Sequence, residues 1–173
     1  MRENSIQTIV VAIDPANAEY IMQNDEIVRM FHRAAKYMRE GKTDMAAWGF
    51  KKAKEKVTLF RERFLTPASI QVGDGVTVNL WSDRYAATVI KVTKSSVTVR
   101  RDKATLNPDF KPEWIPGGFA GHCTNQDEQT YTYQPDKKGQ EYTFRWSRKY
   151  QRYGQPGDLS LSKGRHEFYD YNF

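Results

Sequence analysis

The segment from Lys137 to Tyr153 combines positive charge with aromatic rings. It holds six cations against the single acid Glu141: Lys137, Lys138, Arg145, Arg148, Lys149 and Arg152. Five aromatic residues are interleaved with them: Tyr142, Phe144, Trp146, Tyr150 and Tyr153. Because cations attract phosphates and aromatic faces stack on bases, this pattern is typical of a surface that holds single-stranded nucleic acid. The alternative is that Tyr142, Phe144 and Trp146, which share one face of a strand, belong to the core.

A second basic group consists of Arg100, Arg101 and Lys103. Edge strands often carry such charges only to block aggregation, so this group alone is a weak signal. If the fold places it beside the first segment, the two would form one electropositive face. The formal net charge of +6 is compatible with a nucleic-acid partner.

The glycine-rich stretch from Trp114 to Glu128 contains a further set of polar residues: His122, Cys123, Asn125 and Gln126. A cysteine with a histidine and an amide could form a thiol nucleophile site, with Cys123 as the nucleophile. His122 is poorly placed for this, because neighbours on an extended chain point to opposite sides. The set could instead be a recognition loop for a protein partner, or a loop with a structural role.

The cysteine and histidine content argues against a metal or disulfide framework. One cysteine excludes an intramolecular disulfide, and three scattered histidines show no ligand spacing, so we expect neither a metal nor another cofactor. The longest aliphatic run, residues 9–13, is too short to cross a bilayer, and no signal peptide is recognisable. We therefore expect a cytoplasmic protein without a membrane partner. The oligomeric state stays open.

The first 66 residues read as a strand followed by a helical hairpin. Residues 5–13 are rich in β-branched side chains, which favours a strand. Asp14 and Pro15 predict a short helix to about residue 23, Asn24 caps a second helix that stops at Gly41, and Thr43 caps a third that runs to about residue 64. Apolar residues at helical spacing on the second and third helices predict that these two pack together.

From about residue 67 the pattern changes to an alternation of period two, so we divide the chain into domains 1–66 and 67–173. Three short strands with tight turns are predicted at 76–81, 85–92 and 97–101. The order of these strands and the motifs V-G-D-G-V-T-V and V-I-K-V resemble the opening of Tudor, KOW and other SH3-like barrels. Such barrels often bind ligands at the first turn, which here carries four residues of interest: Trp81, Asp83, Arg84 and Tyr85. The alternative is a turn beside a core tryptophan.

Two further alternating segments, 129–134 and 141–147, flank the turn at 135–139 and predict an extra hairpin, and the segment from Gly154 to Gly157 is expected to end it. The aromatic end of the chain, H-E-F-Y-D-Y-N-F, is expected to dock on the domain. The predicted fold class is therefore α+β, with a strand and a helical hairpin followed by a small SH3-like antiparallel barrel and an extra hairpin.

The wording G-G-F-A-G-H-C-T-N-Q and the closing G-R-H-E-F-Y-D-Y-N-F are similar to a family of small uncharacterised phage and prophage proteins. The resemblance covers the last hundred residues and implies a mobile-element setting but no mechanism. Our leading hypothesis is a non-enzymatic protein that binds nucleic acid through the basic, aromatic face. The second is a protein-interaction factor that inhibits a host or defence protein, and the third is a thiol enzyme centred on Cys123.

Overall fold

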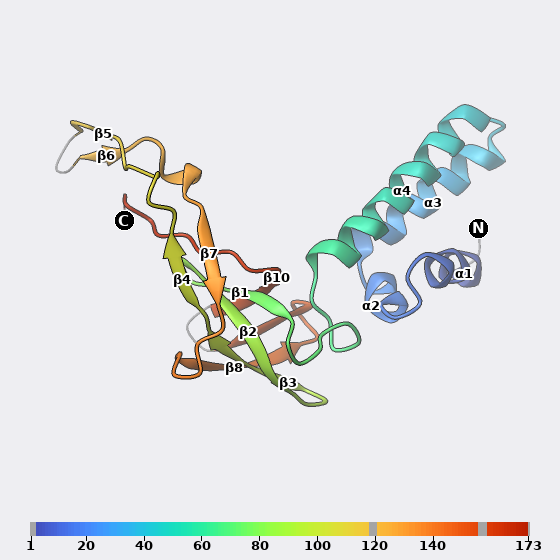
Figure 1. Ribbon diagram of the computed structural model, residues 1–173. Helices are drawn as coiled ribbons and strands as arrows, with labels where there is room; N and C mark the ends of the chain where they lie inside the picture. The colour runs from blue at the N-terminus through green and yellow to red at the C-terminus, as the bar shows by residue number, and fades with distance from the viewer. Residues whose placement is uncertain (1–2, 118–120, 156–158, 173) are drawn as a thin grey trace. The chain divides into compact units, whose positions relative to one another are not determined.

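The computed structural model describes residues 3–117, 121–155 and 159–172. The chain divides into two compact units, Met1–Ser69 and Ile70–Phe173. The first unit is helical and the second is built of strands (Figure 1). Among the described residues, no helix has both the length and the apolar character needed to cross a membrane.

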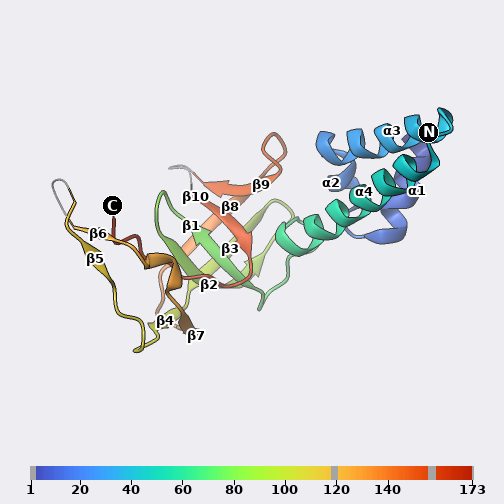
Figure 2. The ribbon, with the colours of Figure 1, turned by 90° about the horizontal axis from the view of Figure 1, so that it is seen from above.

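The helical unit contains four helices: α1 (Glu3–Ile13), α2 (Ala18–Met22), α3 (Asp25–Arg39) and α4 (Thr43–Arg63). Its core is formed by side chains from all four: Ile6, Val10, Ala18, Ile21, Ile27, Phe31, Ala53, Val57 and Phe60. Helices α3 and α4 lie side by side in both ribbon views (Figures 1 and 2). The Phe31 and Phe50 ring centroids are 6.4 Å apart across this contact. A Cβ added to Gly49 would come within 3.0 Å of the Ala34 Cβ, so the two backbones approach closely there.

The strand predicted at residues 5–13 is wrong, because this segment is the helix α1. Ile6 and Val10 are fully buried, and Ile9 and Ile13 pack against the same core. Their spacing of three and four residues forms one helical face. The β-branched composition favours a strand only weakly, and the gain from burying this face on α2 and α4 outweighs it.

The predicted helix ends are confirmed in part. Asn24 caps α3, since its Oδ1 accepts a hydrogen bond from the Ile27 amide at 3.1 Å. Gly41 takes the left-handed φ of 73° that ends this helix region. Thr43 is the first residue of α4 and not its cap, which is Lys42. Asp14 does not cap α2: its carboxylate accepts from the backbone and the side chain of Asn17.

The second unit is built around a closed antiparallel barrel of six strands: β1 (Gly75–Asn79), β2 (Arg84–Val92), β3 (Ser96–Arg101), β8 (Glu141–Ser147), β9 (Arg152–Gln155) and β10 (Leu159–Lys163). The order around the barrel is β1-β10-β9-β8-β3-β2. The predicted meander is present as β1, β2 and β3. Alternate residues point inward and are buried: Val76, Val78, Val89, Val97, Val99, Phe144, Tyr153 and Leu161. Figure 2 shows the barrel from above.

Two small sheets extend from the barrel unit. One pairs β4 (Lys103–Leu106) with β7 (Tyr131–Gln134), and the other pairs β5 (Trp114–Ile115) with β6 (His122–Cys123). A short 3-10 helix, Gln126–Glu128, precedes β7.

The extra hairpin predicted from 129–134 and 141–147 is wrong, because the two strands do not pair with each other. Strand β7 pairs with β4, and β8 pairs with β3. Strands β3 and β4 follow one another directly, so residues 131–147 run antiparallel along both. Lys103 is opposite Gln134 and Arg100 is opposite Glu141, so the segment 135–140 inserts four extra residues on one side. The predicted turn is therefore an excursion within a continuing ladder, comparable to a large bulge.

Candidate nucleic-acid interface

Strands β8 and β9 form the hairpin that carries most of the basic, aromatic segment. Trp146 is opposite Tyr153, and Arg145 is opposite Gly154. Strand β9 ends at Gln155, within the break predicted at residues 154–157, of which 156 and 157 lie outside the described residues. The turn between the strands is held by the Ser147 Oγ, which accepts from the Tyr150 amide at 3.3 Å. Gln151 has a φ of 49°, the left-handed conformation that lets this turn reverse the chain.

A surface hollow of about 470 Å³ opens on this hairpin. Its lining includes cations, aromatic rings and small polar groups: Thr143, Arg145, Trp146, Ser147, Tyr150, Arg152, Gly154, Gln155 and Leu159. Tyr150 is 62% exposed. The Lys149 ammonium lies 5.0 Å, and the Arg152 guanidinium 5.7 Å, from the centre of the Tyr150 ring. Exposed cations and an exposed aromatic face therefore occur together at this hollow. We call its residues and the neighbouring Arg148 and Lys149 the hairpin hollow.

The cations of the hairpin hollow form no ion pair with an acid in the part of the chain that the structure describes. Within residues 3–117, 121–155 and 159–172, no carboxylate forms an ion pair with Arg145, Arg148, Lys149 or Arg152. All four side chains are exposed. They can therefore approach an anion without first breaking an ion pair, which preserves their full electrostatic attraction for phosphate.

The aromatic residues of β8 are divided between the core and the hollow. Phe144 is fully buried, and Tyr142 is partly buried on the same face, with burial raising the pKa of its phenol. Trp146 is partly buried and lies edge-on to Tyr153, with centroids 5.2 Å apart, while its surface also lines the hollow. The alternative of core aromatics thus applies to Phe144, and the binding interpretation is limited to Trp146 and Tyr150.

The second basic group does not join this surface. Arg100 donates to the Glu141 carboxylate from Nε and Nη2, at 3.1 and 2.7 Å. Arg101 donates to the Glu167 carboxylate at 2.8 Å, and its guanidinium lies 3.6 Å from the centre of the Tyr85 ring. Both arginines are therefore engaged in contacts within the unit, and a phosphate would have to displace those contacts.

Three predicted nucleic-acid residues lie at the other end of β8. Lys137 and Lys138 are exposed in the excursion before Glu141, and Lys103 is exposed on β4. The Lys138 amide donates to the Asp136 Oδ1 at 2.8 Å, which shapes this excursion. The lining of the hairpin hollow begins at Thr143, two residues after Glu141. The sequence predicts a shared electropositive face only if the two basic groups lie side by side, and the arginines of the second group are bound to carboxylates instead.

The residues predicted at the first barrel turn hold the end of the chain. The Asp83 Oδ1 accepts from the Asp170 amide at 2.9 Å, and Arg84 forms an isolated bridge with Phe168. The Arg84 guanidinium is also 5.3 Å from the Phe168 ring centre. Trp81 is 82% exposed, so it is neither a core residue nor part of these contacts. The turn therefore serves mainly as an anchor for the tail.

The polar loop residues have a similar internal role. Asn125 accepts from the Glu113 amide and donates to the Lys111 carbonyl, both at 2.9 Å. The Gln126 Oε1 accepts from the Tyr171 amide at 3.0 Å. His122 is exposed on β6 and makes no contact with a nucleophile or a carboxylate in the described part of the chain.

Cys123 is 1% exposed. Its Sγ lies 3.5 Å from the Asn125 Oδ1, and its backbone amide and carbonyl bond the Asn172 side chain at 2.7 and 3.0 Å. The Cys123 side chain is thus buried, and the side chains that hydrogen-bond this residue among the described residues are those of Asn125 and Asn172. No group of three or more His, Cys, Asp or Glu side chains in the described ranges is arranged to hold a metal ion.

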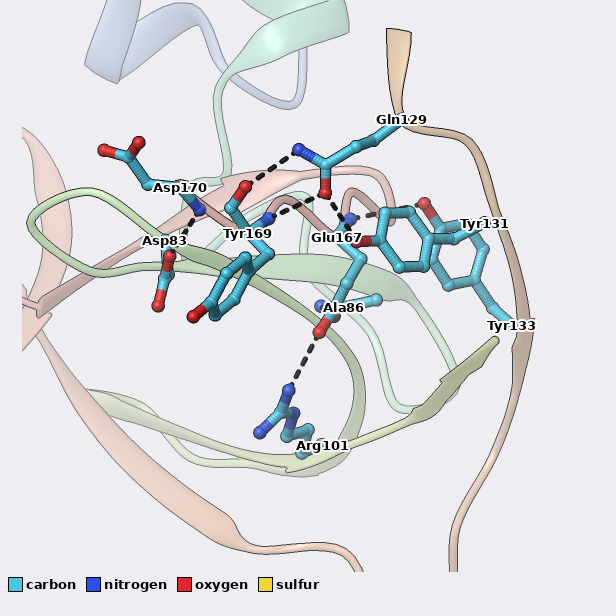
Figure 3. A network of polar contacts seen from close by, with 9 residues as sticks. All are labelled: Asp83, Ala86, Arg101, Gln129, Tyr131, Tyr133, Glu167, Tyr169 and Asp170. Atoms are coloured by element: carbon cyan, nitrogen blue, oxygen red, sulfur yellow. Dashed lines mark hydrogen bonds and ion pairs between the residues drawn. The ribbon is translucent and has the colours of Figure 1, made fainter. Parts of the chain in front are cut away.

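Sequence reasoning missed the polar network that fixes the tail, although the docking of the aromatic tail was expected. We call this network, centred on Glu167, the tail clamp (Figure 3). The Glu167 carboxylate accepts from the Ala86 amide at 2.7 Å and from Arg101, and only 9% of its side chain is exposed. The side-chain Nε2 of Gln129 donates to the Tyr169 carbonyl at 2.8 Å, and its Oε1 accepts from the Tyr169 backbone amide at 3.2 Å.

A second ion pair lies next to the clamp. Asp102 is almost fully buried and accepts from the Arg165 Nε at 2.7 Å and from the Thr88 hydroxyl at 2.7 Å. Arg165 lies directly over Gly75, where an added Cβ would collide with its side chain. No pattern in the sequence pairs these residues, because the partners are 63 positions apart.

Comparison of the chain with protein-family models, with curated proteins and with solved structures found no match. The class that the fold defines is a helical unit followed by a closed six-stranded antiparallel barrel. A fold of this kind does not by itself imply a function, which must come from the site.

Proposed function

We propose that the barrel unit is a non-enzymatic module that binds single-stranded nucleic acid at the hairpin hollow. Phosphates contact the four cations Arg145, Arg148, Lys149 and Arg152, and a base stacks on Tyr150 beside Trp146. The observation that supports the proposal is a set of exposed cations, without an ion pair among the described residues, around an exposed aromatic ring. Arg100 and Arg101, which are held by carboxylates, take no direct part.

The salt dependence of binding follows from the number of cations. For single strands the logarithm of affinity falls with the logarithm of salt concentration by about 0.7 per phosphate contact. Four contacts give a slope of about −3, so raising salt from 50 to 200 mM weakens binding by roughly 50-fold. Loss of one stacking ring reduces affinity by about 1–3 kcal/mol, which is of the order of tenfold.

Fluorescence anisotropy of labelled 12-nucleotide DNA and RNA single strands tests the proposal. Arg145→Gln and Arg152→Gln should each lower the salt slope by about 0.7, and Tyr150→Ala should weaken binding about tenfold at every salt concentration. Arg100→Gln and Trp81→Ala are the matched controls and should bind like the wild type. Binding that is absent at 50 mM salt, or that the control variants weaken as much, would contradict the proposal.

We also propose that the barrel belongs to the SH3-like kind and that the protein comes from a phage or mobile element, acting in the cytoplasm of its host cell. The six short strands with the meander β1-β2-β3 support the first part. The second part depends on the resemblance of the closing segment described above.

A further inference from the structure

The helical unit carries a surface that the nucleic-acid proposal does not use. A groove of about 610 Å³ lies on α3 and α4, and its lining is mainly apolar. Three side chains give it this character: Met30, Met45 and Trp48. Trp48 is 63% exposed and Met45 is 48% exposed, which is unusual for such large apolar groups.

The floor of the groove is low because Gly49 has no side chain and packs against Ala34. The lining residues of α3 run from Met30 to Tyr37, and the seven steps between them correspond to about 10 Å or two helical turns. A groove of this length accepts two turns of a helix laid over the pair, with apolar anchors at positions i, i+3 or i+4, and i+7. Methionine adapts to differently shaped apolar groups, and tryptophan is the residue that most often dominates binding energy.

The charge around the groove selects the occupant. Residues 25–63 contain eleven Lys and Arg against six Asp and Glu, an excess of five positive charges. Arg33 and Lys52 line the groove itself, against the single acid Asp44. Lys52 is paired with Glu55 at 2.8 Å, but both side chains are about 45% exposed, so this surface pair is easily exchanged. In the described part of the chain Arg33 has no carboxylate partner.

We propose that this groove binds an acidic amphipathic helix of a partner protein, whose apolar face contacts Trp48 and Met45 and whose carboxylates contact Arg33 and Lys52. A second copy of this chain is a poorer occupant, because it would bring the same excess of positive charge against itself. The chain then has two binding surfaces, one for nucleic acid on the barrel unit and one for an acidic helix on the helical unit. This proposal does not depend on the first.

The test uses the full chain, immobilised, and a display library of randomised 14-residue peptides as the probe. Enriched sequences should show apolar residues at i, i+3 or i+4, and i+7, with Asp and Glu between them. Trp48→Ala should lower the affinity of the enriched peptides at least tenfold, because the anchor is lost. Trp81→Ala, which removes an exposed tryptophan of the other unit, is the matched control and should leave the affinity unchanged.

Charge reversal at the groove gives a second readout. Arg33→Glu should weaken acidic peptides at least fivefold, whereas Arg29→Glu, one turn earlier on α3 and outside the groove, should not. Since Trp48 and Arg33 are exposed, both variants should keep the wild-type circular dichroism spectrum. The proposal is overturned if no peptide is enriched relative to the Trp48→Ala chain, or if the enriched peptides are basic. It is also overturned if sedimentation shows that the wild type is a dimer and that the Trp48→Ala variant is a monomer, since the occupant of the groove is then a second copy of the chain.

Discussion

Replacing Glu167 by alanine should destabilise the barrel unit far more than replacing Glu141, although both carboxylates pair with adjacent arginines of β3. The two ion pairs have nearly equal lengths, 2.8 Å for Arg101 with Glu167 and 2.7 Å for Arg100 with Glu141. They differ in exposure, because 9% of the Glu167 side chain is exposed against 51% for Glu141. The two carboxylates also differ in their partners, because Glu167 accepts from the buried Ala86 amide as well as from Arg101, whereas Glu141 accepts only from Arg100 in the described contacts.

The magnitude follows from what each truncation leaves behind. Glu167→Ala leaves the buried Ala86 amide without its acceptor, which costs about 1–3 kcal/mol. It also leaves the Arg101 guanidinium without a carboxylate. That guanidinium is 38% exposed and can take up water, so this part adds only about 1 kcal/mol. The expected loss is about 2–4 kcal/mol, against about 0–1 kcal/mol for Glu141→Ala.

The assay must follow the barrel unit alone, because a chain with two units need not unfold in a single transition. Amide hydrogen exchange of the barrel strands during urea titration satisfies this requirement. The Ala86 amide should in addition exchange faster in Glu167→Ala than in the wild type. Glu167→Gln keeps one acceptor oxygen, so its Ala86 exchange rate should lie between the rates of the wild type and of Glu167→Ala. Such comparisons resolve differences in unfolding free energy of roughly 0.5 kcal/mol. The reasoning is refuted if Glu167→Ala and Glu141→Ala lower the unfolding free energy of the barrel unit by amounts that differ by less than this.

Three further predictions concern separate features. Burial raises the pKa of Tyr131 to about 12 from an ordinary value of 10.0, so the folded state holds the phenol proton more tightly than the unfolded state. The contribution of this proton to stability is complete below about pH 10 and is lost as pH rises through about 12. Absorbance titration in the near ultraviolet should show a late-ionising component that Tyr131→Phe reduces, and a titration complete by about pH 11 would contradict this. Cys123 is buried, so it should resist thiol reagents in the native protein and react on denaturation. Cys123→Ala should bind nucleic acid like the wild type, and loss of binding would show that the thiol is needed for function. Gly139→Ala should lower stability by about 1–3 kcal/mol in urea unfolding, because its Cβ meets the Arg101 backbone carbonyl, whereas Gly154→Ala, with 3.5 Å to its nearest neighbour, should change it little.

Local signals predicted the elements that depend on local physics. Asn24 before α3 and Gly41 after it are found where capping and left-handed φ require them. The prediction of a strand at residues 5–13 was wrong because it relied on the β-branched composition and not on the spacing of the apolar residues. Ile6, Ile9, Val10 and Ile13 already indicate a helical face, and that signal was present in the sequence.

Non-local pairing was the part that the sequence could not supply. Segments 129–134 and 141–147 look like a hairpin because a turn lies between them, yet both pair with the continuous run of β3 and β4. For the candidate site, the cation and aromatic spacing located the hairpin hollow. It could not separate Arg101, which Glu167 holds, from Arg145, because that difference is set by a residue 66 positions away.

The closure of the barrel by β10 has a consequence for synthesis of the chain. The Thr77 hydroxyl of β1 donates to the Gly164 carbonyl, 87 positions further along. At about 5–20 residues per second, a ribosome needs on the order of ten seconds to deliver the partner of β1 after β1 itself has been made. During that interval one edge of β1, an apolar strand, has no neighbour and can pair with another nascent chain. Slowed translation between β1 and β10 should therefore lower the yield of folded protein, even though the finished barrel has no open edge.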